Sequence, residues 1–188
     1  MRLVFDIDIL TALILAHIET DPASVCLTPI TTGKHNRSYR VACDAGRFVL
    51  RIAPPDDAGA RVRTGFLFYE RLMMRQEPAM HALIRAKTTI PVAAVVAHDF
   101  SRARIDRDYL LMTVLPGTPL SDACGLGPAQ RRRALRQVGV HLRALHALTA
   151  DEHLGRRMYG YLGAHRPMPP QLTWGEAFHV MWNMLLDG

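Results

Sequence analysis

The stretch from residue 25 to residue 53 constrains the fold most, because it consists of three short β-rich runs separated by turn residues. The runs are Val25–Ile30, Ser38–Ala42 and Arg47–Ala53. The second connection, Asp44-Ala45-Gly46, leaves room only for a tight reversal, and Pro54-Pro55 ends the third run. This spacing predicts a three-stranded antiparallel meander.

Helical periodicity surrounds the meander, and the combination predicts an α+β fold. The predicted helices are Asp6–Glu19, Arg61–Met74, Glu77–Lys87, Pro128–Leu148 and a last helix that Thr173 caps and that ends at Leu186. Two further β-rich runs, Ile90–Ala97 and Tyr109–Val114, are expected to extend the sheet. In the longest helix we expect one buried stripe, formed by Leu135, Val138, Leu142, Leu145 and Leu148.

The composition is that of a globular protein. Of the 188 residues, 49% are apolar and 21% are charged, which excludes a disordered chain because enough apolar surface exists for a core. The three cysteines lie far apart without a Cys-x-x-Cys spacing, so we predict no disulfide framework and no metal site, and we expect a cytoplasmic protein. No apolar run approaches the roughly 20 residues that span a bilayer, so no membrane partner is expected.

The net charge of +6 allows an anionic partner, whether a nucleotide or a nucleic acid. The densest basic run is Arg131-Arg132-Arg133, followed by Arg136 and Arg143, in a helical pattern. No aromatic residues interleave with these arginines, so a solvated helix face is favoured over a nucleic-acid groove.

The turn around Gly33 is the first candidate for binding chemistry. Glycine between two strands can adopt a positive φ and lets a phosphate approach the backbone, and Asn36 and Ser38 can add hydrogen-bond donors. A plain hairpin explains the same residues. The turn has only one of the glycines of the G-x-G-x-x-G pattern, so no dinucleotide fingerprint is present.

Arg51 is a charged residue among apolar neighbours in the third run, within Phe48-Val49-Leu50-Arg51-Ile52. It is tolerated if its side chain is exposed, but burial requires a carboxylate partner. Glu77, on a predicted helix, is the natural partner, and Glu70 is the competitor. A basic strand residue held by a helical glutamate is the device with which protein kinases position nucleotide phosphates.

The run from Tyr109 to Leu115 continues directly into Pro116-Gly117. A strand that ends in this way leaves backbone donors and acceptors unpaired, and such groups can hydrogen-bond a planar base between aliphatic side chains. Taken alone, the same residues also describe an edge strand that ends in a turn.

In their order along the chain, these features resemble the N-terminal part of the aminoglycoside phosphotransferase family, the small-molecule branch of the kinase-like fold. The matching segments are Thr32–Val41, Arg47–Pro54, Glu77 before Ile90-Pro91-Val92, and Leu110–Gly117. Farther on, the matching segments are Leu142–His146, Tyr159–Gly163 and Thr173-Trp174. The resemblance covers nearly the whole chain from about residue 25.

The resemblance implies roles for particular residues. The loop over the ATP phosphates would include Gly33, His35, Asn36 and Ser38. Arg51 would occupy the basic position of the third strand, where lysine is better known, with Glu77 as its helical partner. Val49 would lie against the adenine, and Thr113 and Leu115 would offer main-chain groups to it.

The sequence departs from the family pattern in its catalytic residues. Kinase-type chemistry uses an Asp base, an Mg²⁺-binding Asn five positions later and a second metal-binding Asp downstream. The two asparagines, Asn36 and Asn183, follow Thr31 and Phe178 at that spacing, so neither fits. We therefore expect a truncated phosphotransferase domain that binds ATP weakly and does not turn over, with no catalytic and no metal-binding residue of its own.

The resulting prediction is a kinase-like small lobe over residues 1–114, followed by a hinge and the beginning of a helical lobe over residues 115–188. By lineage, the activity is ATP-dependent phosphoryl transfer to a small-molecule hydroxyl. Mg²⁺ and the small-molecule acceptor are expected only in a complete relative.

Three alternatives remain open. The first is a non-catalytic nucleotide-binding or regulatory module, and the second is an Arg-rich nucleic-acid binder. The third concerns Trp174, Phe178 and Trp182, which fall on one face of the last predicted helix. We expect them to pack as core on the helix over residues 128–148; if exposed, they mark a seam or a partner site.

Overall fold

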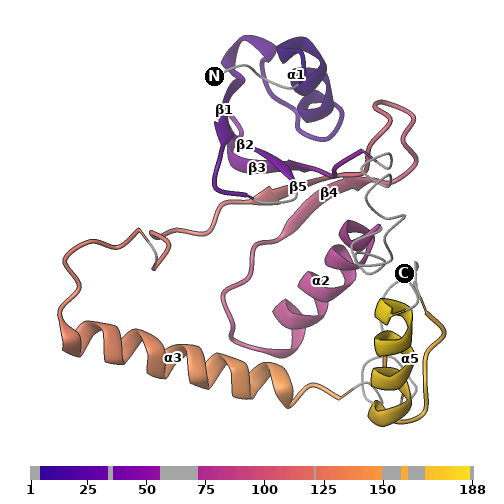
Figure 1. Ribbon diagram of the computed structural model, residues 1–188. Coiled ribbons are helices and arrows are strands. Elements are labelled where there is room, and N and C mark those ends of the chain that lie inside the picture. Colours follow the sequence, from indigo (N-terminus) through magenta and orange to yellow (C-terminus); the bar gives the residue numbers. More distant parts are fainter. Residues whose placement is uncertain are drawn as a thin grey trace.

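The computed structural model describes residues 5–33, 36–55, 72–120, 122–149, 158–160 and 168–186. The helices are α1 (Ile7–Leu15), α2 (Glu77–Lys87), α3 (Pro128–His146) and α5 (Trp174–Leu186), with short 3-10 segments η1 (Pro22–Ser24) and η5 (Met73–Gln76). The strands are β1 (Cys26–Ile30), β2 (Arg37–Cys43), β3 (Gly46–Ile52), β4 (Val95–Asp99) and β5 (Tyr109–Thr113). Figure 1 shows the sheet between α1 and α2, with α3 and α5 beyond α2.

The five strands form one antiparallel sheet in the order β1-β2-β3-β5-β4. The predicted meander is therefore present, and the α+β fold class is confirmed. Gly46 adopts a φ of 131° in the reversal between β2 and β3, a conformation that residues with a side chain rarely adopt. The sequence did not indicate that β5 lies between β3 and β4.

Alternation of side chains along the strands divides the core into two clusters. On one face, the buried α1 residues Leu10, Leu13 and Ile14 pack with strand residues that include Tyr109 and Leu111. On the other face, Leu110 and Met112 pack with Met74 of η5 and with Ala93. Strand β5 is thus buried on both faces, which makes it the central structural element of the sheet.

A polar contact fixes the segment that follows α1. The Nε2 atom of His17 and the hydroxyl of Tyr109 are hydrogen-bonded at 2.9 Å. Burial lowers the pKa of the His17 imidazole, with a further contribution from Arg104, and burial also raises the pKa of the Tyr109 phenol. The periodicity predicted a helix to Glu19, but α1 ends at Leu15, and His17 lies in the turn that follows.

The predicted helix at Glu77–Lys87 is confirmed with the same bounds. Of the helix predicted over Arg61–Met74, residues 61–71 lie outside the described part of the chain. Strand β4 begins at Val95 rather than near Ile90. The preceding carbonyl groups bind α2 instead of a strand: Val92 accepts a hydrogen bond from Arg85 (2.8 Å), and Ala93 is bonded to the His81 ring (2.9 Å).

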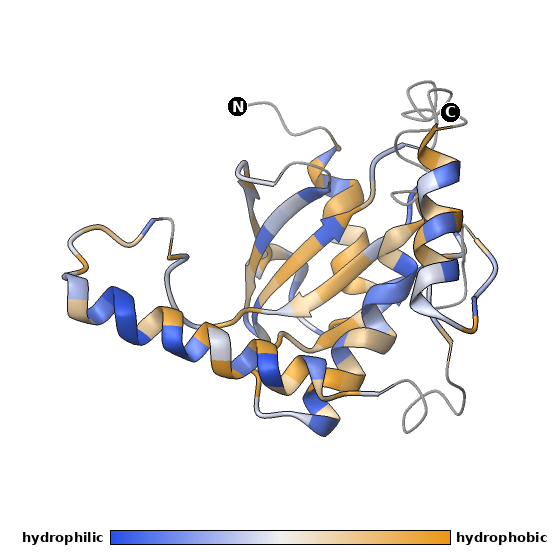
Figure 2. Cartoon of the chain, turned by 60° about the horizontal axis from the view of Figure 1, so that its bottom comes forward, coloured by the Kyte–Doolittle hydropathy of each residue, from blue (hydrophilic) through white to orange (hydrophobic). Residues whose placement is uncertain are grey.

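The expected burial of α3 and α5 is wrong. The side chains of Leu135, Val138 and Leu142 are exposed, and none of the α3 residues is buried. Helix α3 carries polar and apolar residues along its whole length (Figure 2), and of the predicted stripe only Leu145 and Leu148 are half-buried. Periodicity identifies the apolar face of a helix, but that face is buried only where another element lies on it.

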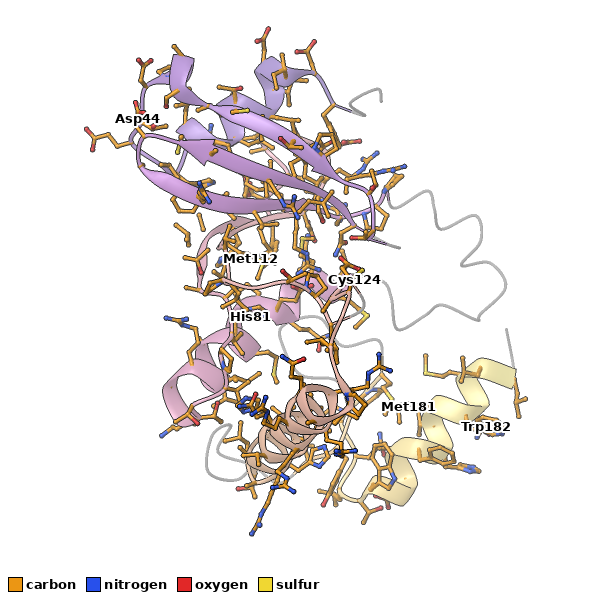
Figure 3. All side chains as sticks on the ribbon, turned by 90° about the vertical axis from the view of Figure 1, so that its left-hand side faces the viewer. Asp44, His81, Met112, Cys124, Met181 and Trp182 are labelled. Carbon is orange, nitrogen blue, oxygen red and sulfur yellow. The ribbon has the colours of Figure 1, made fainter. Side chains whose placement is uncertain are left out.

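The aromatic face of α5 is also exposed, contrary to expectation. The side chains of Trp174, Phe178 and Trp182 retain 58%, 51% and 52% of their accessible surface. They contact one another instead, with ring centroids 6.2 and 6.1 Å apart, and Figure 3 places Trp182 on the side of α5 away from α3. Thr173 caps α5 as predicted, accepting a hydrogen bond from the backbone N–H of Glu176. No helix in the described ranges has the length and apolarity needed to cross a membrane.

The packing of α1 predicts unequal effects for two isoleucines on that helix. Ile14 is fully buried in the core, whereas Ile9 is 43% exposed. We expect Ile14→Ala to lower the free energy of unfolding by about 2–5 kcal/mol, because it leaves a cavity against the sheet. The matched substitution Ile9→Ala is expected to change it by less than about 1 kcal/mol. Urea unfolding monitored by circular dichroism measures both, and equal losses would contradict this packing.

Candidate functional site

Arg51 lies on the α2 face of the sheet, because its neighbours Leu50 and Ile52 pack into the α1-side core. Its guanidinium forms a bidentate ion pair with Glu77, the first residue of α2. One bond joins Nη2 to Oε1 at 3.1 Å, and the second joins Nη1 to Oε2. The pairing predicted from the sequence is therefore present. About a quarter of each side chain is exposed, 26% for Arg51 and 25% for Glu77, so the pair is accessible to a ligand.

A further contact supports this ion pair on the α2 face of the sheet. The Nη1 atom of Arg51 lies 3.9 Å from Sδ of Met112, a buried residue of β5. Figure 3 shows Met112 on the side of the sheet that faces α2, on which His81 lies. The alternative partner, Glu70, lies outside the described residues.

A buried carboxylate before β5 was missed by the sequence reasoning. Asp108, immediately before β5, is 1% exposed and accepts hydrogen bonds from two arginines. Arg75 donates from Nε to Oδ2 at 2.7 Å and from Nη2 to Oδ1 at 2.9 Å, and Arg102 donates from Nε to Oδ1 at 2.9 Å. Arg75 also donates to the carbonyl of Phe100 at 3.1 Å and lies over its ring.

Burial opposes ionisation of Asp108, but the hydrogen bonds from Arg75 and Arg102 outweigh burial and lower the pKa of its carboxyl. The sequence signal was weak, because Asp108 is one of several charged residues between β4 and β5. Its one distinguishing mark is its position directly before the apolar run of β5.

The turn between β1 and β2 is described only in part, and His35 lies outside the described residues. Gly33 does not adopt the positive φ that a glycine can adopt. Instead, a Cβ atom at Gly33 would lie 3.3 Å from the carbonyl oxygen of Asn36, so the close approach within the turn favours glycine. Ser38 pairs with Arg51 in the register of β2 and β3, which places the end of this turn next to the ion pair.

The predicted base-binding residues lie on β3 and at the end of β5. Val49 pairs with Met112 across the two strands. The backbone N–H of Thr113 donates to the carbonyl of Ala94 at 2.9 Å, so it is committed within the structure and not available to a base. Leu115 is exposed, and its backbone groups have no hydrogen-bond partner in the described part of the chain. Leu115 is thus the stronger of the two predicted backbone contacts.

These residues place a carboxylate-held guanidinium next to the end of the β1–β2 turn, and the exposed strand end at Leu115 lies farther along the same sheet. Such a combination can orient an anionic group beside a planar one. Within the described ranges, no group of three His, Cys, Asp or Glu side chains is arranged to hold a metal ion, so we assign no residue to a metal.

Comparison with protein families places the sequence. The model of the phosphotransferase enzyme family matches residues 27–170, which include all or nearly all of each strand and the whole of α2 and α3. The chain belongs to the phosphotransferase enzyme family. Helix α1 and helix α5 lie outside the matched residues of this family member.

A solved structure has the same fold. It is the crystal structure of a "putative aminoglycoside phosphotransferase" from Ralstonia eutropha JMP134, with 18% sequence identity and a TM-score of 0.53. The match covers 79% of this chain and 40% of that chain, so this phosphotransferase family member spans less than half the length of that structure. No curated protein matches the sequence significantly.

The Asp108 cluster predicts a specific pH dependence of stability. Because the pKa of Asp108 is lower in the folded than in the unfolded chain, its contribution is complete above pH ~4 and is lost as the pH falls through the folded pKa. We expect Asp108→Asn to lower the free energy of unfolding by about 2 kcal/mol at pH 7. Urea unfolding of both proteins from pH 7 to pH 3 measures the gap, which should shrink below pH ~4. A gap that grows towards low pH would contradict this ionisation.

Proposed function

We propose that this chain binds ATP, and that it represents the nucleotide-handling part of a phosphotransferase that transfers phosphate to a small-molecule hydroxyl. The observation that supports the proposal most is the Arg51–Glu77 ion pair, which lies beside the β1–β2 turn. Membership of the phosphotransferase enzyme family supports the reaction class. The proposed acceptor is a small molecule that carries a hydroxyl group.

Arg51 retains hydrogen-bonding capacity for phosphate after it has bound Glu77. A guanidinium has five N–H donors, of which Glu77 and Met112 engage three. The Nε–H and one Nη2–H have no partner among the described residues. Glu77 fixes the plane of the guanidinium, so these donors are presented in one orientation, a property that a lysine at this position would not provide.

The remaining contacts are assigned by position. The backbone of Leu115 would hydrogen-bond the base, with Val49 against one face of the ring. The turn from Gly33 to Ser38 would cover the phosphates. In kinase-type enzymes Mg²⁺ neutralises charge on the phosphates, and here we assign it no ligand among the 188 residues.

The nucleic-acid alternative rests on the arginines of α3. At about 100° per residue, Arg132, Arg136 and Arg143 fall on one face of the helix and Arg131 and Arg133 point to either side, but no aromatic residue interleaves with them to stack on bases. A groove that binds nucleic acid needs its cations along one surface. Binding of nucleic acid is untested and remains a prediction of the less favoured hypothesis.

The proposal predicts that one arginine of β3 governs nucleotide affinity and that another does not. We expect Arg51→Gln to weaken MgATP binding by about 10-fold to 100-fold, because a charge-assisted bond to phosphate is lost. Arg47→Gln is the matched control, because Arg47 lies on the same strand and face, roughly 13 Å away at the β2–β3 turn. Isothermal titration calorimetry measures both affinities. Equal affinities of wild type and Arg51→Gln, or an equal loss in Arg47→Gln, would contradict the proposal.

A second measurement concerns transfer itself. None of the asparagines in the 188 residues follows an aspartate at the spacing that the kinase reaction uses. We therefore expect the purified 188-residue chain to bind ATP without transferring phosphate to sugars, amino alcohols or aminoglycosides. Radiolabelled ATP with a panel of these acceptors measures transfer, and stoichiometric product formation would show that other residues supply the base.

A further inference from the structure

Asp108 connects the two elements that carry the Arg51–Glu77 ion pair. Its backbone carbonyl accepts a hydrogen bond from the N–H of Ala53 at 2.8 Å, and Ala53 lies two residues after Arg51. Its carboxylate binds Arg75 through two hydrogen bonds, and Arg75 lies two residues before Glu77. One residue therefore joins the end of β3 to the beginning of α2.

The ion pair between Arg51 and Glu77 is a weaker anchor for α2 than a fully buried one. About a quarter of each side chain is exposed, so water partly screens the charges, and two long side chains lose their freedom in the pair. The contacts of Asp108 are of a different kind, because its carboxylate is 1% exposed and removing a partner leaves a buried charge. Asp108 is therefore a stronger anchor for α2 than the Arg51–Glu77 ion pair, because it is buried and because it binds residues close to both members of that pair.

Helix α2 is anchored at a second point farther along. The His81 ring is bonded to the carbonyl of Ala93, and Arg85 donates to the carbonyl of Val92. These contacts attach the middle of α2 to the segment before β4. The first turn, where Glu77 lies, depends instead on Arg75 and on the packing of Met74 in the core.

We propose that Asp108 is a positioning residue for the nucleotide site: acting through Arg75, it fixes the first turn of α2 so that Glu77 orients the Arg51 guanidinium. Asp108 itself touches neither Arg51 nor Glu77 in the structure. The part of this proposal that concerns affinity rests on the proposed binding of ATP. The part that concerns the placement of α2 does not.

Arg102 provides a matched control within the same cluster. It donates to the same carboxylate at 2.9 Å, and its side chain is exposed to the same extent as that of Arg75, 28% in each case. However, Arg102 lies in the connection between β4 and β5, six residues from Asp108, and not next to α2. Loss of Arg102 removes a charge-assisted bond from Asp108 without freeing the start of α2.

The experiment compares Arg75→Gln with Arg102→Gln in the full 188-residue chain, with MgATP as the probe in calorimetry. Thermal unfolding first identifies a temperature at which both variants are folded. We expect Arg75→Gln to weaken MgATP binding about tenfold and Arg102→Gln to change it less than about twofold. In a Glu77→Gln background, Arg75→Gln should have no further effect, because the bidentate ion pair through which it acts is already absent.

Equal affinity losses in Arg75→Gln and Arg102→Gln would overturn the proposal, because they would indicate a general loss of stability. A full, additive loss in the Glu77→Gln background would also overturn it, because the effect would not pass through Glu77. Asp108→Asn, where it folds, should reproduce Arg75→Gln, and an unchanged affinity in this variant would contradict the assigned role.

A readout without ligand separates this inference from the proposed function. Amide hydrogen exchange in the first turn of α2 should accelerate in Arg75→Gln and remain at the wild-type rate in Arg102→Gln. If the wild type shows no saturable MgATP binding, the proposed function fails, while this exchange pattern still supports the placement of α2 by Asp108. Unchanged exchange in both variants would overturn the positioning role whatever the outcome with MgATP.

Discussion

A charged side chain on an apolar strand is the constraint on which the site depends. Arg51 lies between two residues that are buried in the core on the opposite face of the sheet. Its guanidinium therefore has to emerge on the α2 side, where Glu77 meets it with both carboxylate oxygens. Because a planar guanidinium bound in this way has a fixed orientation, its remaining donors are directed before any ligand arrives.

The sheet and the elements on its two faces surround the strand and the helix that carry these two residues. Helix α1 closes one face of the sheet, and β5, buried on both faces, ties the strand that carries Arg51 to the cluster around Asp108. Strand β5 ends at Thr113, two residues before the exposed Leu115. Strand β5 thus links the Asp108 cluster, the strand that carries Arg51 and the segment that leads to Leu115.

Local signals in the sequence were enough for the presence of the described helices and strands, though not for every boundary, and for the ion pair. Side-chain alternation and turn residues predict the meander. An arginine among apolar strand residues, with few glutamates available as partners, predicts the ion pair. Both signals depend on short-range chemistry. Three features required tertiary information. The position of β5 beside β3 depends on a crossover, the role of Asp108 depends on arginines from two other segments, and the exposure of Trp182 depends on which element lies against α5. The division at residue 114 and the roles of Gly33, Asn36 and Ser38 toward a nucleotide stay predictions.

The most direct test of the central claim is nuclear magnetic resonance of the ¹⁵N-labelled 188-residue chain during titration with MgATP, observing backbone amides and the Nε–H groups of arginine. We predict saturable shifts at the Nε–H of Arg51, at the amides of the β1–β2 turn and at Leu115, with the resonances of α3 unchanged. Shifts confined to the arginines of α3, or none at Arg51, would contradict the assignment of this ion pair to the nucleotide phosphates.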